Sequence, residues 1–453
     1  MANTSGRSFK PPKPDAPRLL VFDLITEVNR HGGYSNLLLP KALAASNFEE
    51  RDKGFATELL YGTLRMQGRH DWILEQVSDR PWNDVDAGII DVTRMGVHQL
   101  FEMRVATHAA VSATVELARK VLGESKASFV NALLRKVSAL SLEEWVEPLR
   151  AEKDPIRRLA ILHSHPEWIV SAYFDLLKDE DEVESILIAN NTPAVPTLVA
   201  WPGLSTQEDL IECGGVPTQF SPYGVRMPGS PGSLDLIRSR KAGVQDEGSQ
   251  LVAQIFSQAA IKNDNWLDLC AGPGGKAALL SAIAREQGKN FTANETSEIR
   301  AALVKQVIGE FPIIVSDGRK IKDLGVTYGA ILADVPCTGL GALRRRPEVR
   351  WRRTPADLRA LIELQHDLAE AAISILDVGG IFGYATCSPH FAETRVQVKD
   401  ILRGHPELEQ LQVGDYMSSE LRDAGACDGA NLALWTHRQG TDAMFLALFR
   451  RVS

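Results

Sequence analysis

Apolar residues recur every three or four positions along the first third of the chain. Leu20, Leu24 and Val28 show the spacing that gives a helix one apolar face, here from Arg18 to Arg30. The same pattern predicts four further helices, at Phe55–Met66, Ala87–Phe101, His108–Leu122 and Ser128–Leu140. Glycine and proline fall between these segments, and no strand pattern accompanies them. Residues 18–140 are therefore predicted to form an all-helical bundle.

The pattern changes twice after this bundle. Residues 141–192 keep helical spacing and become more acidic, which predicts a helical connector. Residues 193–244 contain frequent prolines and glycines with short β-like runs, which predicts a small α+β subdomain.

Strand and helix patterns alternate from residue 245 to residue 453, which predicts an α/β domain. Strands are expected at Trp266–Cys270, Phe291–Asn294, Ile313–Val315, Gly329–Ala333, Gly380–Ala385, Leu432–Trp435 and Met444–Phe449. Helices are expected at Lys276–Glu286, Ser297–Gly309, Pro355–Leu376 and Glu393–Arg403. This alternation is typical of a parallel sheet covered by helices.

Composition narrows the class of protein. Of the 453 residues, 44% are hydrophobic and 24% charged, as in ordinary globular proteins, and no run approaches the length of a membrane span. Residues 1–17 are polar and proline-rich, which predicts a disordered tail without an export signal. The five cysteines lack metal-site spacing. We therefore expect a cytoplasmic monomer with reduced thiols, no metal and no membrane partner.

The first strand of the α/β domain ends in a glycine-rich turn that opens a helix. Glycines allow close approach of a ligand, and a helix start offers free amides. Glu295, after the second strand, is placed for ribose hydroxyls, and Asp317, after the third, for an adenine. No phosphate-binding signature is present. The cofactor predicted is therefore S-adenosylmethionine, bound by Asp268, Cys270, Ala271, Gly272, Pro273, Gly274, Gly275, Lys276, Glu295, Arg300, Asp317, Gly318 and Asp334.

Two cysteines, Cys337 and Cys387, follow the fourth and fifth strands, where the chain reaches the cofactor crevice. Methylation of cytosine carbon 5 needs a thiolate that adds to carbon 6, an acid near ring nitrogen 3 and a proton acceptor. Asp334, three residues before Cys337, is placed for the acid role. The remaining cysteines are expected to be small buried hydrophobic residues; they are Cys213, Cys270 and Cys427.

Three segments resemble the signatures of the RNA cytosine-5 methyltransferases: Asp268–Lys276, Asp334–Gly339 and Thr386–Pro389. The resemblance implies that Cys387 is the nucleophile and that Cys337 assists product release. It also implies that Asp334 contacts the target base and that Lys276 lines the site. Gly272 stands where many members of the family have alanine, a mild departure.

The helical first part resembles the NusB-like RNA-binding fold, on the segments Arg51–Arg65, Asp91–Gln99 and Ser128–Arg135. Gln245–Gln250 resembles the start of the catalytic domain in the ribosomal RNA small-subunit methyltransferase B family. Together these implied domains give the layout of that family: an all-α NusB-like bundle, a small α+β subdomain and a class I, Rossmann-like methyltransferase domain.

The net charge of −8 argues weakly against a nucleic-acid partner. A basic cluster after Cys337 changes this balance, because arginines with an aromatic residue can hold an RNA backbone or stack on a base. The RNA-binding residues predicted are Arg344, Arg345, Arg346, Arg350 and Trp351.

The sequence thus predicts methyl transfer to carbon 5 of an unpaired cytidine in 16S ribosomal RNA, through a covalent cysteine–base intermediate. Two alternatives stay open. One is a transfer-RNA cytosine-5 methyltransferase, and only the family resemblance favours ribosomal RNA over it. The other is a non-catalytic RNA-binding or ribosome-assembly factor, which the helical bundle would serve but which does not require two thiols at strand ends.

Overall fold

The computed structural model describes residues 15–229 and 231–453. The chain forms two compact units, one up to Ser171 together with Arg345–Arg352, and one of Ala172–Arg344 with Arg353–Ser453. Most of the tail predicted for residues 1–17 lies outside the described residues. Ala16 and Pro17, however, already belong to the first helix, which Asp15 caps by accepting a hydrogen bond from the Arg18 amide.

The first unit is helical among its described residues, as predicted. Its α-helices up to residue 162 are α1 (Ala16–His31), α2 (Ser35–Ala45), α3 (Glu50–Val77), α4 (Ala87–Phe101), α5 (Thr107–Leu122), α6 (Glu124–Val137), α7 (Leu142–Val146) and α8 (Pro155–Leu162). Apolar faces meet in one core that includes Ile25, Leu59, Val92 and Leu134, each fully buried. The α2 helix was not predicted from the sequence, because its proline and few buried residues weaken the helical pattern.

The segment Arg345–Arg352, which ends in the helix α16 (Val349–Arg352), belongs to this helical unit. The carboxylate of Glu348 accepts hydrogen bonds from the amide and hydroxyl of Ser35 at 3.1 and 2.7 Å. The Trp351 indole N–H donates to the carbonyl of Leu64, at 3.1 Å. The segment is therefore a packed part of the bundle.

The second unit begins within α9 (Glu167–Leu177) and contains a small antiparallel sheet of order β2-β3-β1-β4. Its elements are α10 (Glu180–Asn191), β1 (Thr197–Ala200), α11 (Gln207–Glu212), β2 (Val216–Pro217), β3 (Gly224–Arg226), α12 (Asp235–Arg238) and β4 (Ala242–Val244). The buried residues Leu198, Leu210 and Val225 form its core. The four strands lie within residues 193–244, for which an α+β character was predicted, whereas α10 lies in the predicted helical connector. The boundaries of the connector and the subdomain stay predictions.

The large sheet has the order β11-β12-β13-β9-β8-β5-β6-β7, with β10 paired to β13. Its strands are β5 (Asn265–Asp268), β6 (Asn290–Glu295), β7 (Ile313–Val315), β8 (Tyr328–Asp334), β9 (Leu376–Thr386), β10 (Leu408–Leu411), β11 (Cys427–Asp428), β12 (Asn431–Ala433) and β13 (Phe445–Arg451). Strands β5 to β9 pair in parallel, but β10 to β13 pair antiparallel. The sheet is thus mixed, and the prediction of a parallel sheet was wrong at this end.

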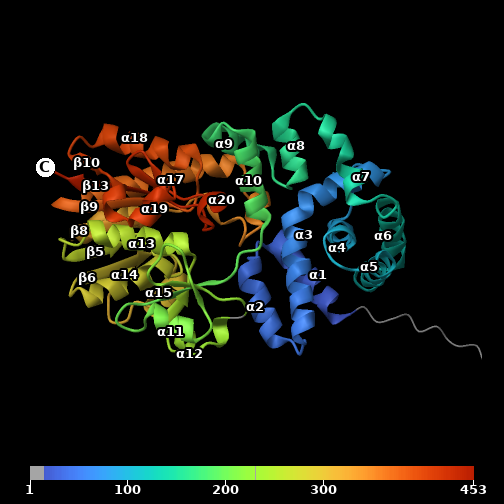
Figure 1. Ribbon diagram of the computed structural model, residues 1–453, viewed down its shortest axis with the longest axis horizontal. Helices are drawn as coiled ribbons and strands as arrows, with labels where there is room; N and C mark the ends of the chain where they lie inside the picture. The colour runs from blue at the N-terminus through green and yellow to red at the C-terminus, as the bar shows by residue number, and fades with distance from the viewer. Residues whose placement is uncertain (1–14, 230) are drawn as a thin grey trace, which may run out of the picture. The chain divides into compact units, whose positions relative to one another are not determined.

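Helices cover both faces of the large sheet (Figure 1). They are α13 (Glu247–Ala259), α14 (Gly275–Glu286), α15 (Glu298–Lys305), α17 (Pro355–Ser374), α18 (Arg395–Gly404) and α19 (Ser419–Asp423). The short helix α20 (Thr436–Gln439) packs against α10. Along β8, Ala330 and Leu332 pack into the core with α13 and α14, while Ile331 and Ala333 pack into the core with α17. This alternation of side chains explains why the strand is apolar throughout.

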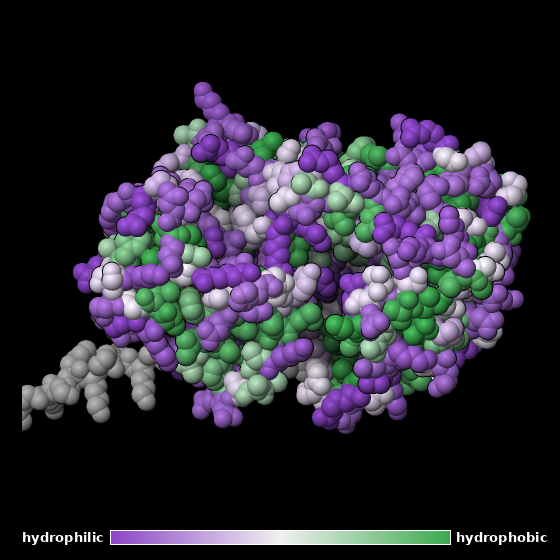
Figure 2. All heavy atoms as spheres, turned by 180° about the vertical axis from the view of Figure 1, so that it is seen from behind, coloured by the Kyte–Doolittle hydropathy of each residue, from purple (hydrophilic) through white to green (hydrophobic). Residues whose placement is uncertain are grey.

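Short 3-10 helices complete the chain: η1 (Trp82–Asp84), η2 (Glu147–Ala151), η3 (Pro231–Ser233), η4 (Gly318–Leu324), η5 (Leu340–Ala342), η6 (Phe391–Glu393) and η7 (Val413–Tyr416). Figure 2 shows polar side chains over most of the visible face, with apolar patches between them. Among the described helices, none combines the length and the apolar character that crossing a membrane requires.

Candidate active site

The glycine turn after β5 adopts a backbone that its sequence requires. Gly272 and Gly274 have positive φ angles of 57° and 105°, which other residues rarely adopt. Gly274 also packs closely, since a Cβ there would lie 2.9 Å from the Val307 side chain. Gly275, the first residue of α14, borders open space instead. The turn therefore leaves room for a ligand at the helix start.

A buried carboxylate lies beside this turn at the end of β5. Asp268 is 1% exposed, and none of the described residues donates a hydrogen bond to either of its carboxylate oxygens in acceptable geometry. Burial, and next the charge of Asp334, raises the pKa of Asp268 to about 7. Such a group calls for a cationic partner. S-Adenosylmethionine carries an ammonium and a sulfonium, so the residues present fit this cofactor.

Two further strands bring their ends to the same edge of the sheet. Glu295, at the end of β6, is 4% exposed and accepts hydrogen bonds from the Ser297 amide at 2.8 Å and from the Arg300 guanidinium. Asp317, two residues after β7, caps η4, and its hydrogen bond with the Arg319 side chain lowers its pKa. The strand order β5-β6-β7 places Asp268, Glu295 and Asp317 in the predicted sequence along this edge.

Asn294 was missed by the sequence analysis. Its side-chain amide donates to the carbonyl of Leu269 at 2.9 Å and to that of Ser316 at 3.2 Å. These bonds link β6 to the segments that follow β5 and β7. Because β6 also carries Asn290, Thr292 and Glu295, no sequence signal set Asn294 apart.

Lys276 and Asp334 form an ion pair with 2.8 Å between Nζ and Oδ2. Lys276 is 8% exposed, and although burial lowers its pKa, the charge of Asp334 more than compensates and raises it. Lys276 is therefore an ammonium at neutral pH. The ion pair thus links Lys276, which follows the glycine turn, to Asp334, which was predicted to contact the target base.

The two thiols meet, with 3.3 Å between the Sγ atoms of Cys337 and Cys387. The parallel register of β8 and β9 explains this, because Asp334 pairs with Ala385 and each cysteine follows within three residues. The hydrogen bond with Cys387, and next burial, raises the pKa of Cys337 well above its usual value. Cys337 is therefore a neutral thiol that can donate its S–H to the sulfur of Cys387.

Two of the other three cysteines differ from what was predicted. Cys213 and Cys427 are exposed, so the prediction that they are buried hydrophobic residues was wrong. Cys213 is the residue at the end of the short helix α11, and Cys427 lies on β11, the edge strand of the sheet. At these positions the neighbouring elements leave both side chains exposed. Cys270 is partly buried behind the turn, and burial raises its pKa well above its usual value.

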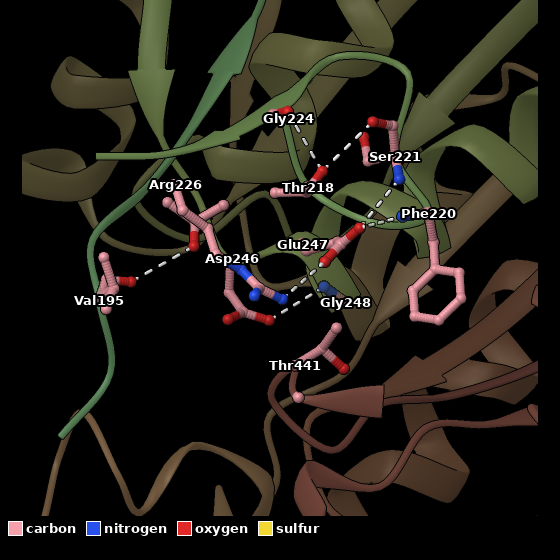
Figure 3. A network of polar contacts seen from close by, with 12 residues as sticks. Val195, Thr218, Phe220, Ser221, Gly224, Arg226, Asp246, Glu247, Gly248 and Thr441 are labelled. Atoms are coloured by element: carbon pink, nitrogen blue, oxygen red, sulfur yellow. Dashed lines mark hydrogen bonds and ion pairs between the residues drawn. The ribbon is translucent and has the colours of Figure 1, made fainter. Parts of the chain in front are cut away.

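The arginines of the basic cluster are buried or partly buried, and none is fully exposed among Arg344, Arg345, Arg346 and Arg350. Arg344 lies in the second unit, and its guanidinium contacts Asp246 at 2.7 Å and Asp442 at 3.1 Å, both buried carboxylates. Figure 3 shows the surroundings of Asp246, which caps α13 through the Gly248 amide, and of its neighbour Glu247. Glu247 accepts hydrogen bonds from the amides of Phe220 and Ser221 in the small subdomain.

Arg350 is 0% exposed and donates to the carbonyl of Ser164 at 3.1 Å within the helical unit. This burial gives no support to an RNA contact by Arg350, and its RNA-binding role stays a prediction. Trp351 is partly buried against Gly68, where an added Cβ would lie 2.3 Å from the ring. Arg345 and Arg346 are also partly buried, and their RNA-binding role stays a prediction.

Among the described residues, no group of three or more His, Cys, Asp or Glu side chains could hold a metal ion. The arrangement is instead a buried carboxylate beside a glycine turn, with a pair of thiols at the ends of neighbouring strands.

Comparison with known proteins identifies the family. The 16S rRNA methyltransferase RsmB/F family matches residues 257–450, and the NusB family matches residues 15–139. A Mycobacterium tuberculosis protein named as a methyltransferase, without a stated substrate, is 42% identical and covers 97% of each chain. The ribosomal RNA small subunit methyltransferase B of Pseudomonas syringae is 30% identical over 82% of this chain and 83% of its own. The chain belongs to the RsmB/F methyltransferase family.

This RsmB/F member is an S-adenosylmethionine-dependent RNA methyltransferase with a NusB domain at its N-terminal end. The crystal structure of PH0851 shares its fold, with a TM-score of 0.79 at 20% identity over 96% of this chain and 99% of the other. The predicted fold class is thereby confirmed.

Proposed function

We propose that this protein methylates carbon 5 of a cytidine in 16S ribosomal RNA through a covalent adduct with Cys387. The observation that carries the proposal is the pair of thiols 3.3 Å apart, next to the Lys276–Asp334 ion pair at the ends of adjacent strands. Methylation of an exocyclic nitrogen or a ribose oxygen would need no second thiol at this place.

Each side chain has a role in this proposal. The Cys387 thiolate adds to carbon 6, which makes carbon 5 electron-rich enough to take the methyl group. Asp334, held by Lys276, contacts the pyrimidine ring near nitrogen 3. The proton on carbon 5 then leaves to a base, the carbon 5–carbon 6 double bond re-forms, and the bond from sulfur to carbon 6 breaks. S-Adenosylmethionine supplies the methyl group when it is bound.

Cys337 assists the departure of Cys387. As a neutral thiol at 3.3 Å, it donates a hydrogen bond that stabilises the Cys387 thiolate before attack and again on release. A neutral Cys337 thiol beside Cys387 fits the predicted assignment, in which Cys387 attacks and Cys337 assists release.

The test is transfer of tritium from labelled S-adenosylmethionine to unmodified 16S ribosomal RNA. We expect incorporation into 16S RNA, little into transfer RNA, and none with Cys387→Ala. Labelling of transfer RNA instead would favour the alternative substrate, and no labelling of any RNA would leave the assembly-factor alternative.

A further inference from the structure

A second contact, besides that of the thiols, joins the two cysteine loops. Thr338 directly follows Cys337, and Ser388 directly follows Cys387; their hydroxyl oxygens lie 3.0 Å apart. Both residues are fully buried. The loops are therefore connected by two rungs, one made by the thiols and one made by the hydroxyls.

The carboxylate of Glu393, in η6, anchors the hydroxyl rung. Its Oε1 accepts hydrogen bonds from the Thr338 amide at 2.8 Å and from the Gln365 side-chain amide at 2.9 Å, and its Oε2 accepts from the Thr338 hydroxyl. Because the Thr338 hydroxyl donates its hydrogen bond to the carboxylate, the Ser388 hydroxyl must be the donor in its contact with the Thr338 oxygen. The acid thereby fixes the direction of the chain of hydrogen bonds.

Further contacts hold the acid itself in place. Glu393 is 0% exposed, and the Tyr384 hydroxyl donates to its backbone carbonyl at 2.9 Å. The same Gln365 amide also donates to the carbonyl of Pro336, directly before Cys337, at 2.9 Å. The loop of Cys337 is thus bound to Glu393 directly and through Gln365, from the helix α17.

We infer that Glu393 is a positioning residue that sets the separation of the two thiols. A buried carboxylate is costly unless it is satisfied, and all three of its described donors serve the cysteine loops. Its link to methyl transfer rests on the proposed function, whereas its effect on thiol spacing does not. A hydrogen bond between thiols is weak, so the hydroxyl rung and its acid determine where the sulfurs lie.

The variant Glu393→Gln tests this with little change in size. A glutamine offers one acceptor oxygen and one N–H₂ donor, so at least one of the three donors loses its partner wherever the oxygen lies. Glu363→Gln is the matched control, because it makes the same chemical change on an exposed site of α17. Both are made in a chain in which the exposed Cys213 and Cys427 are replaced by serine.

The first readout is binding of phenylarsine oxide, in which one trivalent arsenic bonds to two nearby thiols with release of water. We expect tight binding in the parent chain, loss with Cys337→Ala, and about tenfold weaker binding with Glu393→Gln, corresponding to ~1.4 kcal/mol. The Glu363→Gln control should bind like the parent. Equal affinity of the parent and Glu393→Gln would overturn the inference.

The second readout is kinetic. Misplacing a reacting group by about 1 Å costs roughly a hundredfold in rate, so kcat should fall by about that factor while KM for S-adenosylmethionine stays within about twofold. Unchanged kcat would also overturn the inference. Should Glu393→Gln fail to fold, Thr338→Val removes the Thr338 hydroxyl, and with it both the contact with Ser388 and the hydrogen bond to Glu393. The same loss of arsenical binding is expected. If no variant methylates RNA, including the parent, the proposed function fails, and arsenical binding still reports the thiol spacing.

Discussion

The buried carboxylate of Asp268 makes the affinity for S-adenosylmethionine depend on pH. Its pKa is raised to about 7 by burial and by the charge of Asp334. Below that pH the carboxyl is protonated and neutral, and above it the group carries the negative charge that a cationic ligand requires. Affinity should therefore increase as the pH rises.

The size of the effect follows from the ionised fraction. With a pKa of about 7, the fraction rises from about 3% near pH 5.5 to about half near pH 7.0, roughly a sixteenfold change. This corresponds to ~1.6 kcal/mol of binding free energy at 25 °C. This pH range lies below the pKa of an α-amino group, so the ammonium of the ligand stays mostly charged throughout.

Isothermal titration calorimetry with S-adenosylmethionine, repeated across this pH range, measures directly how the affinity changes with pH. The wild type should bind more tightly with rising pH, whereas Asp268→Asn should bind weakly and with little pH dependence. Asp264→Asn makes the same change on an exposed side chain before β5 and should keep the wild-type slope. A flat wild-type profile, or the same slope in Asp268→Asn, would refute this reasoning.

Two further predictions concern the thiols and the arginine anchor. Cys387→Ala should abolish methyl transfer, whereas Cys337→Ala should accumulate a covalent protein–RNA species on a denaturing gel; accumulation with Cys387→Ala instead would reverse the two roles. Arg344→Ala should lower the free energy of unfolding by about 3–5 kcal/mol, because it removes the cation between the buried carboxylates of Asp246 and Asp442. Urea unfolding measures this loss, and a change of less than about 1 kcal/mol would show that the ion pairs contribute little.

The residues at the ends of the strands were the part of the site that the sequence predicted best. Asp268, Glu295 and Asp334 each end a strand of the parallel region, so the strand pattern alone brought them to one edge. The meeting of Cys337 with Cys387 follows from the register of β8 and β9. The roles of these residues in binding and chemistry stay predictions.

The pattern of apolar and polar residues could not predict contacts between side chains that are far apart in the sequence. A run of arginines looks the same whether it faces solvent or, like Arg350, meets the carbonyl of Ser164 from 186 positions away. Glu393 fell at the start of a predicted helix, where an acid normally has only a local capping role. Its actual donors, Thr338 and Gln365, come from other parts of the chain. The antiparallel pairing of β13 was missed because alternation of strand and helix stops before it.

The central claim is the site of methylation on the base, and nucleoside analysis of the labelled RNA tests it most directly. Unmodified 16S RNA is incubated with the protein and tritiated S-adenosylmethionine, digested to nucleosides and separated beside standards. The account predicts that the label elutes with 5-methylcytidine and that the Cys387→Ala protein yields none. Label that elutes with any other methylated nucleoside would contradict it.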